Sequence, residues 1–374
     1  MAGVHAFLPP SGAGSWVHCA MWATMNRLYP QDDSPETLEG NAAHWCFVEL
    51  FWNRPLSLAS VADNGIPVTQ EMIDGAQLYV RTVDEHLRER GLDRSVLVVE
   101  GRVTMPSVHA LNFGTPDTRY GWNRSGLHAF EYKFGHRFVD AYQNWQNIDY
   151  LLGMADQIPD FDDLTTPFSL TVVQPRNHDG EGYVRTWMGM MHELRPFRNI
   201  LAAAADKAVA PNPTATPGAH CYECPGRHAC LPLQRSGYKV VWLSKQSVPI
   251  ELSDDALGNE LKLLRDAAEV LKHRIGGLED DAMLRMTRKG RSVPHFAIEQ
   301  ALGREAWNRP VEDVIAMGKL FGKDLGKPGV LTPKQAKEAG MPAALVDPMI
   351  KQETRGLKLV EDDGRKAAKA FGRK

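Results

Sequence analysis

The sequence predicts a mixed α/β domain followed by a mostly helical and irregular C-terminal region. Three observations support this prediction. Helical periodicity dominates the first 90 residues, a Val-rich segment and a strand hairpin follow, and helices then alternate with a further strand. No segment repeats along the chain, so a mixed α/β core is expected in place of a repeat array.

Helices are expected in the N-terminal quarter, where apolar residues recur at helical spacing. Ser15 is placed to cap the first helix, and the next two cover residues 35–51 and 70–90. Gly91 follows the third helix directly, as a glycine that ends a helix commonly does.

Strands are expected in the middle of the chain, where Val-rich or alternating patterns replace the helical ones. The four expected strands cover residues 95–104, 114–120, 127–134 and 167–174. Residues 123–126, Asn-Arg-Ser-Gly, have the composition of a turn between the second and third strands. Two further helices are expected over residues 138–154 and 187–207.

The amino-acid composition changes after these elements. Residues 211–218 are rich in proline and form a loop, and residues 253–285 predict one or two helices packed as a hairpin, interrupted near Gly276 and Gly277. From about residue 290 the chain is basic and rich in glycine and proline. We therefore expect one domain over residues 1–240 and an appended helical and basic region over residues 241–374.

The composition is that of a soluble globular protein. Hydrophobic residues make up 43% and charged residues 24% of the 374 residues. No apolar run approaches the roughly 20 residues of a membrane span, and no secretory signal is visible, so we expect a cytoplasmic protein without a membrane partner. The net charge is −3, yet residues 281–374 hold 19 Lys and Arg against 12 Asp and Glu. This asymmetry fits an acidic metal site with a phosphate-facing segment; uneven surface solvation is the alternative.

Three charged residues of the expected hairpin have the chemistry of a metal site. Glu131 and Lys133 lie on one face of their strand because side chains alternate, and Asp117 of the preceding strand can lie beside them. Carboxylates suit Mg²⁺ or Mn²⁺, which polarises a phosphodiester and lowers the pKa of a bound water. The lysine can orient that water or stabilise the developing anion. The alternative is a surface ion pair across two strands.

The cysteines predict a second site. Cys221, Cys224 and Cys230 lie within one short window, and an odd total of five cysteines argues against a disulfide framework. A four-thiolate site needs one more ligand, from Cys19 or Cys46. Thiolates favour zinc or an iron–sulfur cluster, and the spacing alone does not decide between them.

Four short motifs occur in a particular order: Gly40–His44, Gly114–Asp117, Glu131–Lys133 and Gln146–Tyr150. In that order the chain resembles the RecB-like branch of the PD-(D/E)XK nuclease superfamily, which has a helical G-x-x-x-H, a G-x-x-D strand, a (D/E)-x-K strand and a Q-x-x-x-Y helix. The resemblance implies a restriction-endonuclease-like core, with a mixed central sheet flanked by helices.

The resemblance also implies roles for individual residues. The divalent metal would be held by His44, Asp117 and Glu131, with the backbone carbonyl of Tyr132 as an extra ligand. Lys133 would act on the water nucleophile, while Gln146 and Tyr150 would shape the site or contact DNA. Glu49 and Glu100 are secondary candidates for acids behind the metal ligands.

The cysteine pattern resembles the same family. Some RecB-like nucleases, including the AddB nuclease domain and the CRISPR-adaptation exonucleases, carry one cysteine before the core and C-x2-C-x5-C after it. Those cysteines bind a 4Fe–4S cluster that joins the two ends of the domain. The resemblance implies such a cluster here, with Zn²⁺ as the alternative, on Cys19, Cys221, Cys224 and Cys230. Cys46 is left over, and we expect it to be buried as a small apolar residue.

The nearest resemblance is to phage and prophage RecB-like proteins long catalogued as a domain of unknown function. It runs from about Phe7 to Gly237, includes Val173–Arg176, and departs at Asn41, where Thr or a similar residue is more usual. The expected function is a divalent-metal-dependent DNA nuclease, an exonuclease, that serves phage recombination, replication or DNA processing in a bacterial host.

The expected partners are DNA and a phage recombination protein, a single-strand-binding protein or a separate helicase, since the chain has no helicase phosphate-binding motif. One alternative is a non-catalytic, zinc-stabilised DNA-binding or assembly module. Another is a nuclease of CRISPR spacer acquisition, which the long C-terminal region and the phage resemblance argue against.

Overall fold

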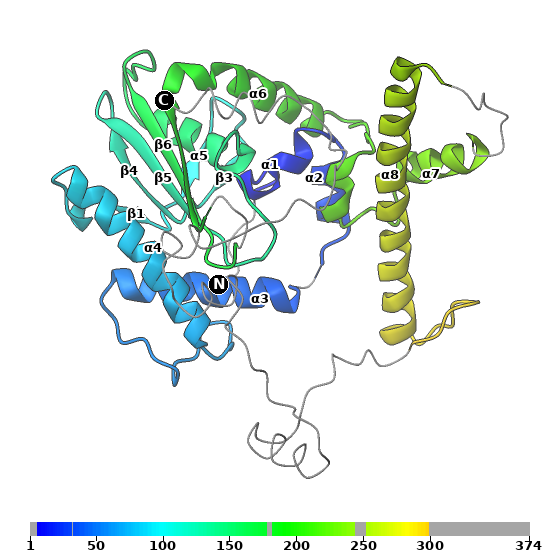
Figure 1. Cartoon of the computed structure of the whole chain (residues 1–374), viewed down its shortest axis with the longest axis horizontal. Coiled ribbons are helices and arrows are strands. Elements are labelled where there is room, and N and C mark those ends of the chain that lie inside the picture. Colours follow the sequence, from blue (N-terminus) through cyan, green and yellow to red (C-terminus); the bar gives the residue numbers. More distant parts are fainter. Residues whose placement is uncertain (1–5, 32, 178–181, 244–251, 299–374) are drawn as a thin grey trace, which may run out of the picture. The chain divides into compact units, whose positions relative to one another are not determined.

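The computed structural model describes residues 6–31, 33–177, 182–243 and 252–298 (Figure 1). Residues up to Gly290 belong to one compact unit, and Arg291–Arg365 to a second, of which only residues 291–298 are described. Most of the basic region over residues 281–374, which was expected to face phosphates, lies outside the described residues.

A five-stranded mixed sheet forms the centre of the first unit. Its strands follow one another across the sheet as β1 (Val98–Val99), β4 (Thr118–Trp122), β5 (Gly126–Tyr132), β6 (Pro167–Val173) and β7 (Val184–Met190). The β5–β6 pair is parallel and the other three pairs are antiparallel. A separate two-stranded sheet pairs β2 (Val103–Thr104) with β3 (Phe113–Gly114).

Helices cover both faces of the sheet (Figure 1). The α-helices are α1 (Ala13–Trp16), α2 (Trp22–Leu28), α3 (Pro35–Phe51), α4 (Gln70–Glu89), α5 (Trp145–Asp156), α6 (Arg195–Val209), α7 (Leu231–Leu243) and α8 (Asp254–Thr287). The short 3₁₀ helices are η1 (Pro10–Gly12), η2 (Arg94–Val96), η3 (Met191–Leu194) and η4 (Ala219–Glu223). The described part of the chain has no helix long and apolar enough to cross a membrane.

Strand β5 faces two separate cores because its side chains alternate. Phe130 and Tyr132 pack with α3 and α4, whereas Leu127 and Ala129 pack with α5 and α6. Every residue of β5 is buried. Glu131 has the parity of Leu127 and Ala129, so its side chain projects toward α5, the helix that carries Gln146 and Tyr150.

Several expected elements are confirmed. The helix expected over residues 35–51 is α3, which Ser34 caps by accepting a hydrogen bond from the Thr37 N–H at 3.2 Å. The helix expected over 70–90 is α4, and Gly91 follows it with φ +66°. The third and fourth expected strands correspond to β5 and β6.

The expected helix over residues 187–207 is wrong in its first part. Residues up to Met190 belong to β7, which pairs with β6 along its whole length, and α6 begins only at Arg195. A short apolar run fits a strand or a helix equally well, and pairing with β6 decides this case. The helix expected over 138–154 begins only at Trp145, because Asn144 caps it and Gln143 has φ +53°.

Three other expectations on local structure are also wrong. Ser15 lies inside α1 and does not cap a helix. The strand expected over residues 95–104 is broken into η2, β1 and β2, with Glu100 between the strands at φ +48°. The strand expected over 114–120 begins only at Thr118, and the residues before it form the connection from β3 that carries Asp117.

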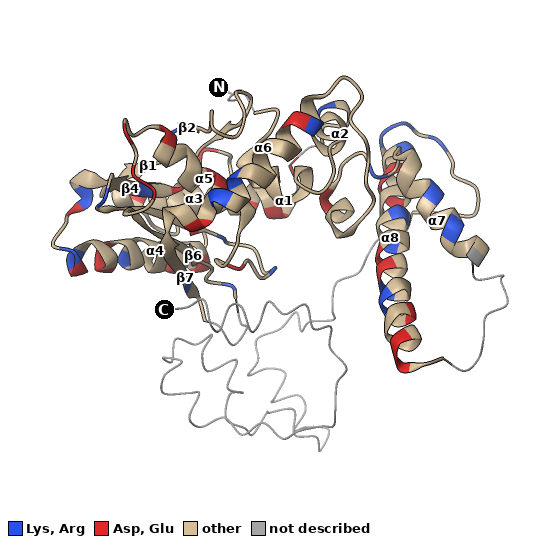
Figure 2. Cartoon of the chain, turned by 90° about the horizontal axis from the view of Figure 1, so that it is seen from above, with Lys and Arg blue, Asp and Glu red and all other residues tan. Residues whose placement is uncertain are grey.

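Helix α8 is continuous through Gly276 and Gly277, so the expected break is wrong. A Cβ atom on Gly277 would lie 2.5 Å from Arg227 Cγ and 2.9 Å from the backbone nitrogen of His228. The glycine thus allows a close approach between helix and loop. The hairpin partner of α8 is α7, which spans residue 240, and acidic and basic side chains alternate along α8 (Figure 2). The division into domains at that residue stays a prediction.

Candidate functional site

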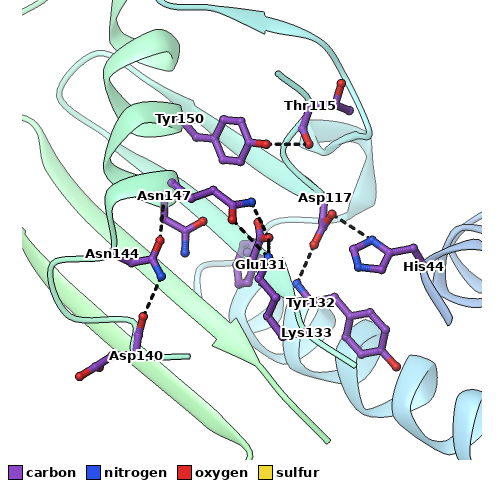
Figure 3. A network of polar contacts seen from close by, with 12 residues as sticks. His44, Thr115, Asp117, Glu131, Tyr132, Lys133, Asp140, Asn144, Asn147 and Tyr150 are labelled. Atoms are coloured by element: carbon purple, nitrogen blue, oxygen red, sulfur yellow. Dashed lines mark hydrogen bonds and ion pairs between the residues drawn. The ribbon is translucent and has the colours of Figure 1, made fainter. Parts of the chain in front are cut away.

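The candidate site lies where β5 ends. Asp117 precedes β4, Glu131 lies near the end of β5, and Lys133 follows that strand directly. Helix α5 contributes Gln146. Helix α3 contributes His44 from the other side (Figure 3). Antiparallel pairing of β4 with β5 brings the first two residues together, as the hairpin predicts.

Asp117 connects α3 to the end of β5. Its side chain is nearly buried, at 10% exposure, and its Oδ1 atom lies 3.1 Å from Nδ1 of His44. Its Oδ2 atom accepts a 2.6 Å hydrogen bond from the backbone N–H of Tyr132. The Tyr132 side chain packs on the opposite face, against Phe47 of α3 at a ring-centroid distance of 5.6 Å.

Glu131 forms a closed triangle with a lysine and an amide. Its Oε1 atom lies 2.6 Å from Lys133 Nζ and accepts a 2.7 Å hydrogen bond from Gln146 Nε2. Lys133 Nζ also donates to Gln146 Oε1 at 3.2 Å. The Gln146 amide therefore fixes both charged groups through its two ends.

The pKa directions at the site reflect burial together with the mutual influence of the charged groups. Burial and then repulsion by Asp117 raise the pKa of Glu131, although Lys133 and His44 oppose that change. Burial disfavours the charged forms of Lys133 and His44. The attraction of the carboxylates outweighs it, so the pKa of each is raised. Two buried carboxylates that repel each other make a site that favours a cation.

Tyr150 supports the site indirectly, through the backbone before Asp117. Its hydroxyl donates to the backbone carbonyl of Thr115 at 3.2 Å, two residues before Asp117, and does not contact the charged groups directly (Figure 3). Asn112, directly before β3, donates through its amide to the buried Asp149 of α5 at 2.9 and 2.8 Å. Helix α5 therefore holds the segment that carries the first carboxylate.

The side chains point at one another more than at a shared ion position. In the part of the chain that the structure describes, no three His, Cys, Asp or Glu side chains are placed to hold a metal ion together. Asp117 is directed to His44 and a backbone N–H, and Glu131 to Lys133. The oxygen-rich donor set suits Mg²⁺ or Mn²⁺, and Glu131 would have to exchange its lysine partner for the ion.

Acidic residues outside the four motifs also lie here. A pocket of about 480 Å³ beside the site is lined by His44, Glu100 and Asp63, among others. The Glu100 N–H donates to the Asp117 carbonyl at 2.9 Å, and burial raises the pKa of the Glu100 side chain. Asp63 gave no signal of its own in the sequence. Glu49, the other secondary candidate, pairs with Arg54 at 2.8 Å.

The residues after β6 hold the loop that follows Lys133. Gln174 is fully buried and donates to the carbonyls of Gly135 and Arg137 at 2.7 and 2.6 Å. Arg185 donates to the carbonyl of Val139 at 2.8 Å. The sequence indicated residues 173–176 only through the family resemblance, because these contacts depend on the distant partner loop.

Four cysteines converge on a second site. One small pocket is lined by Cys19, Cys221, Cys224 and Cys230. Burial raises the pKa of the Cys224 thiol to about 11, and the other three cysteines add to this because thiolates repel one another. Cys46 lies elsewhere, fully buried in the α3–α4 core, as expected.

The thiol spacing bears on which group would fit. A mononuclear zinc site needs sulfurs about 2.3 Å from a single point. Among the described residues, no three His, Cys, Asp or Glu side chains are placed to hold a single metal ion. A cubane cluster holds its thiolates farther apart because four irons stand between them. The four-thiol donor set suits such a cluster.

The fold and site define a mixed α/β protein with a buried carboxylate–lysine centre and a four-cysteine pocket. The chain belongs to the family described as Protein of unknown function (DUF2800), whose sequence model matches residues 5–320. That match covers the sheet, both sites, α7 and α8.

Proposed function

We propose that the chain is a divalent-metal-dependent DNA nuclease that hydrolyses phosphodiester bonds. The observation that supports this most strongly is the meeting of two buried carboxylates with a lysine and an amide at one strand end. A surface ion pair would leave its carboxylates in water, whereas Asp117 and Glu131 are 7% and 4% exposed. Burying two like charges costs free energy of folding, and such an arrangement is typical of sites where a function requires it.

The metal would be held by Asp117, Glu131 and His44. When bound, it would polarise the phosphodiester and lower the pKa of a water. Lys133 keeps its proton through the attraction of both carboxylates, so its ammonium can orient a nucleophile or stabilise negative charge on the phosphate. Gln146 keeps Lys133 in line with Glu131 through both ends of its amide.

We also propose the finer fold and cofactor that this function implies. The fold is a RecB-like PD-(D/E)XK core, and a 4Fe–4S cluster binds at Cys19, Cys221, Cys224 and Cys230. Support comes from the mixed sheet with helices on both faces and from the four thiols in one pocket. The setting we propose is phage recombination, replication or DNA processing in a bacterial cytoplasm, beside a separate recombination, single-strand-binding or helicase protein.

Cleavage assays on matched variants test the nuclease. The wild type should degrade linear DNA with Mg²⁺ or Mn²⁺ and stop when EDTA is added. Glu131→Gln and Lys133→Met should each lower the rate about a hundredfold or more, the order of effect of losing a transition-state group. Glu85→Gln, an exposed acid on α4, is the control and should retain full activity.

Circular dichroism and thermal unfolding show whether each variant is folded. Cleavage at the wild-type rate by a folded Glu131→Gln protein would refute the assignment. Metal-independent DNA binding by a wild type that never cleaves would favour the non-catalytic module instead.

A further inference from the structure

We propose that a pocket beside Lys133 binds one nucleotide of a single DNA strand, adjacent to the phosphate that is cleaved. Its base would stack on the imidazole rings of His18 and His220, and its phosphate would bind Arg137. This inference rests on the proposed nuclease function and names the part of the substrate that the chain holds outside the carboxylate site.

The pocket has the size of a nucleotide site. Its volume is about 540 Å³, within the range of roughly 300–1,000 Å³ typical of small-ligand sites. The end of α1 and the turn after it supply Ser15 and His18, the loop after β5 supplies Arg137, and η4 supplies Tyr222 and Glu223. A duplex is too wide for this volume, so a single unpaired nucleotide is the fitting occupant.

The imidazole rings of His18 and His220 stack on each other, and a base would extend this stack. The imidazoles of His18 and His220 are nearly parallel, with 25° between their planes and 5.8 Å between their centroids. A hydrogen bond of 2.8 Å between His220 Nε2 and the Thr216 carbonyl fixes one ring, and the edge of Trp145 supports the other. Flat, supported rings are what single-stranded nucleic acids stack on.

Arg137 provides the charge for a phosphate. Its guanidinium lies over the Tyr222 ring, 5.4 Å from the centroid, and forms an ion pair with Glu223. Its side chain is 70% exposed, so a ligand can reach it. Glu223 therefore occupies the position of the anion that a guanidinium binds, and a DNA phosphate would replace it.

The pocket adjoins the carboxylate site. Arg137, which lines the pocket, follows Lys133 on the same loop, and the ring of Trp145 contacts the ring of His18. Trp145 precedes Gln146 on α5. On the other side of the site, the pocket around His44 carries Asp63 and Glu100, which repel phosphates. A strand that leaves the cleaved phosphate therefore meets favourable charge on the Lys133 side.

Binding measured without cleavage tests the pocket. The full chain is titrated in EDTA, at one fixed salt concentration, into a fluorescent twelve-residue oligothymidine, and anisotropy gives the Kd. Arg137→Gln should weaken binding about tenfold, because it removes a charge-assisted phosphate contact. Glu223→Gln should tighten binding, because it frees the guanidinium. Arg81→Gln, an exposed change on α4, should leave Kd unchanged.

A separate experiment tests the contact with the base. His18→Ala should weaken oligothymidine binding about fivefold, and this penalty should vanish with an abasic oligonucleotide of equal length. Equal Kd values for the wild type, Arg137→Gln and Glu223→Gln, or the same direction of change in both variants, would overturn the pocket.

The two proposals can fail separately. If the wild type binds with this pattern but never cleaves, the nuclease fails and the pocket stands. If Glu131→Gln abolishes cleavage while Arg137→Gln, Glu223→Gln and His18→Ala bind like the wild type, the pocket fails and the nuclease stands.

Discussion

At the scale of single residues, a buried carboxyl group on α5 helps to hold the segment that carries Asp117. Asp149 on α5 is completely buried, and the Asn112 amide donates to its carboxylate. Burial raises the pKa of Asp149 to about 7, and the Asn112 hydrogen bond opposes the shift. In the unfolded chain the same carboxyl ionises near 3.8.

This difference makes stability depend on pH. The folded state prefers the protonated carboxyl, so stability is full below the unfolded pKa and is lost as pH rises toward the folded pKa of about 7. About three pKa units correspond to roughly 4 kcal/mol at most. Asp149→Asn cannot ionise, and its new amide can donate to Asn112 Oδ1, which has no partner among the described atoms.

We therefore predict that Asp149→Asn gains stability over the wild type as pH rises from 5 to 8. Urea unfolding at four pH values measures the difference, which should grow up to about pH 7 and then level off. Asp206→Asn, an exposed acid on α6, should show no pH-dependent difference. A constant difference for Asp149→Asn over the whole range would contradict the buried-charge explanation.

At the same scale, the sequence identified much of the candidate site but not its surroundings. Glu131 and Lys133 share a face because strand side chains alternate, which needs no knowledge of the rest of the fold. Glu100 was predicted only as a secondary candidate, and Asp63 and Arg137 could not be found this way. Their relation to the site comes from loops that meet only when α3, η4 and the sheet come together.

At the scale of elements, strong local patterns predicted α3, α4, β5 and β6, and weak ones failed. Trp187–Met190 is apolar enough for either a helix or a strand, and the ladder with β6 makes it a strand. The segment before Trp145 has helical composition, yet it forms a loop. Gln174 and Arg185 donate hydrogen bonds to backbone carbonyls at its start and thereby hold this conformation. Such contacts between distant residues are invisible in a local window.

Helix α8 allows a sharp test of packing against propensity. We predict that Gly277→Ala destabilises the protein by about 1–3 kcal/mol, because its Cβ would meet the backbone nitrogen of His228 at 2.9 Å. Gly276→Ala should instead stabilise it by up to about 1 kcal/mol. Its nearest neighbours are the Arg227 guanidinium atoms at 3.7 Å or more, which is ordinary contact.

Urea unfolding of both variants, with limited proteolysis between α7 and α8, measures this prediction. Both glycines lie in the same helix and have the same propensity, so the pair isolates the effect of the Arg227–His228 loop. Two variants that change stability in the same direction would contradict the packing described here.

At the scale of the whole molecule, the four-cysteine pocket connects segments far apart in the chain. Cys19 follows α1, whereas the other three cysteines lie about 200 residues later, in and after η4. A backbone hydrogen bond from Met21 to Thr214, at 3.2 Å, already joins the two segments. A group bound to all four thiols would close this long loop, and such a closure restricts the unfolded chain.

The cluster that we propose predicts how metal content and stability change together. Protein purified without oxygen should contain about four irons per chain and absorb visible light. Cys19→Ser and Cys221→Ser should each lose the iron and unfold at lower temperature, because cluster binding is coupled to folding. Cys46→Ala should keep the full iron content, since Cys46 lies in the α3–α4 core and outside the pocket. Iron and zinc analysis with thermal unfolding measures both effects on the same samples. Stoichiometric zinc without iron, after growth in iron-rich medium, would replace the cluster with a zinc site that must draw the thiols closer together.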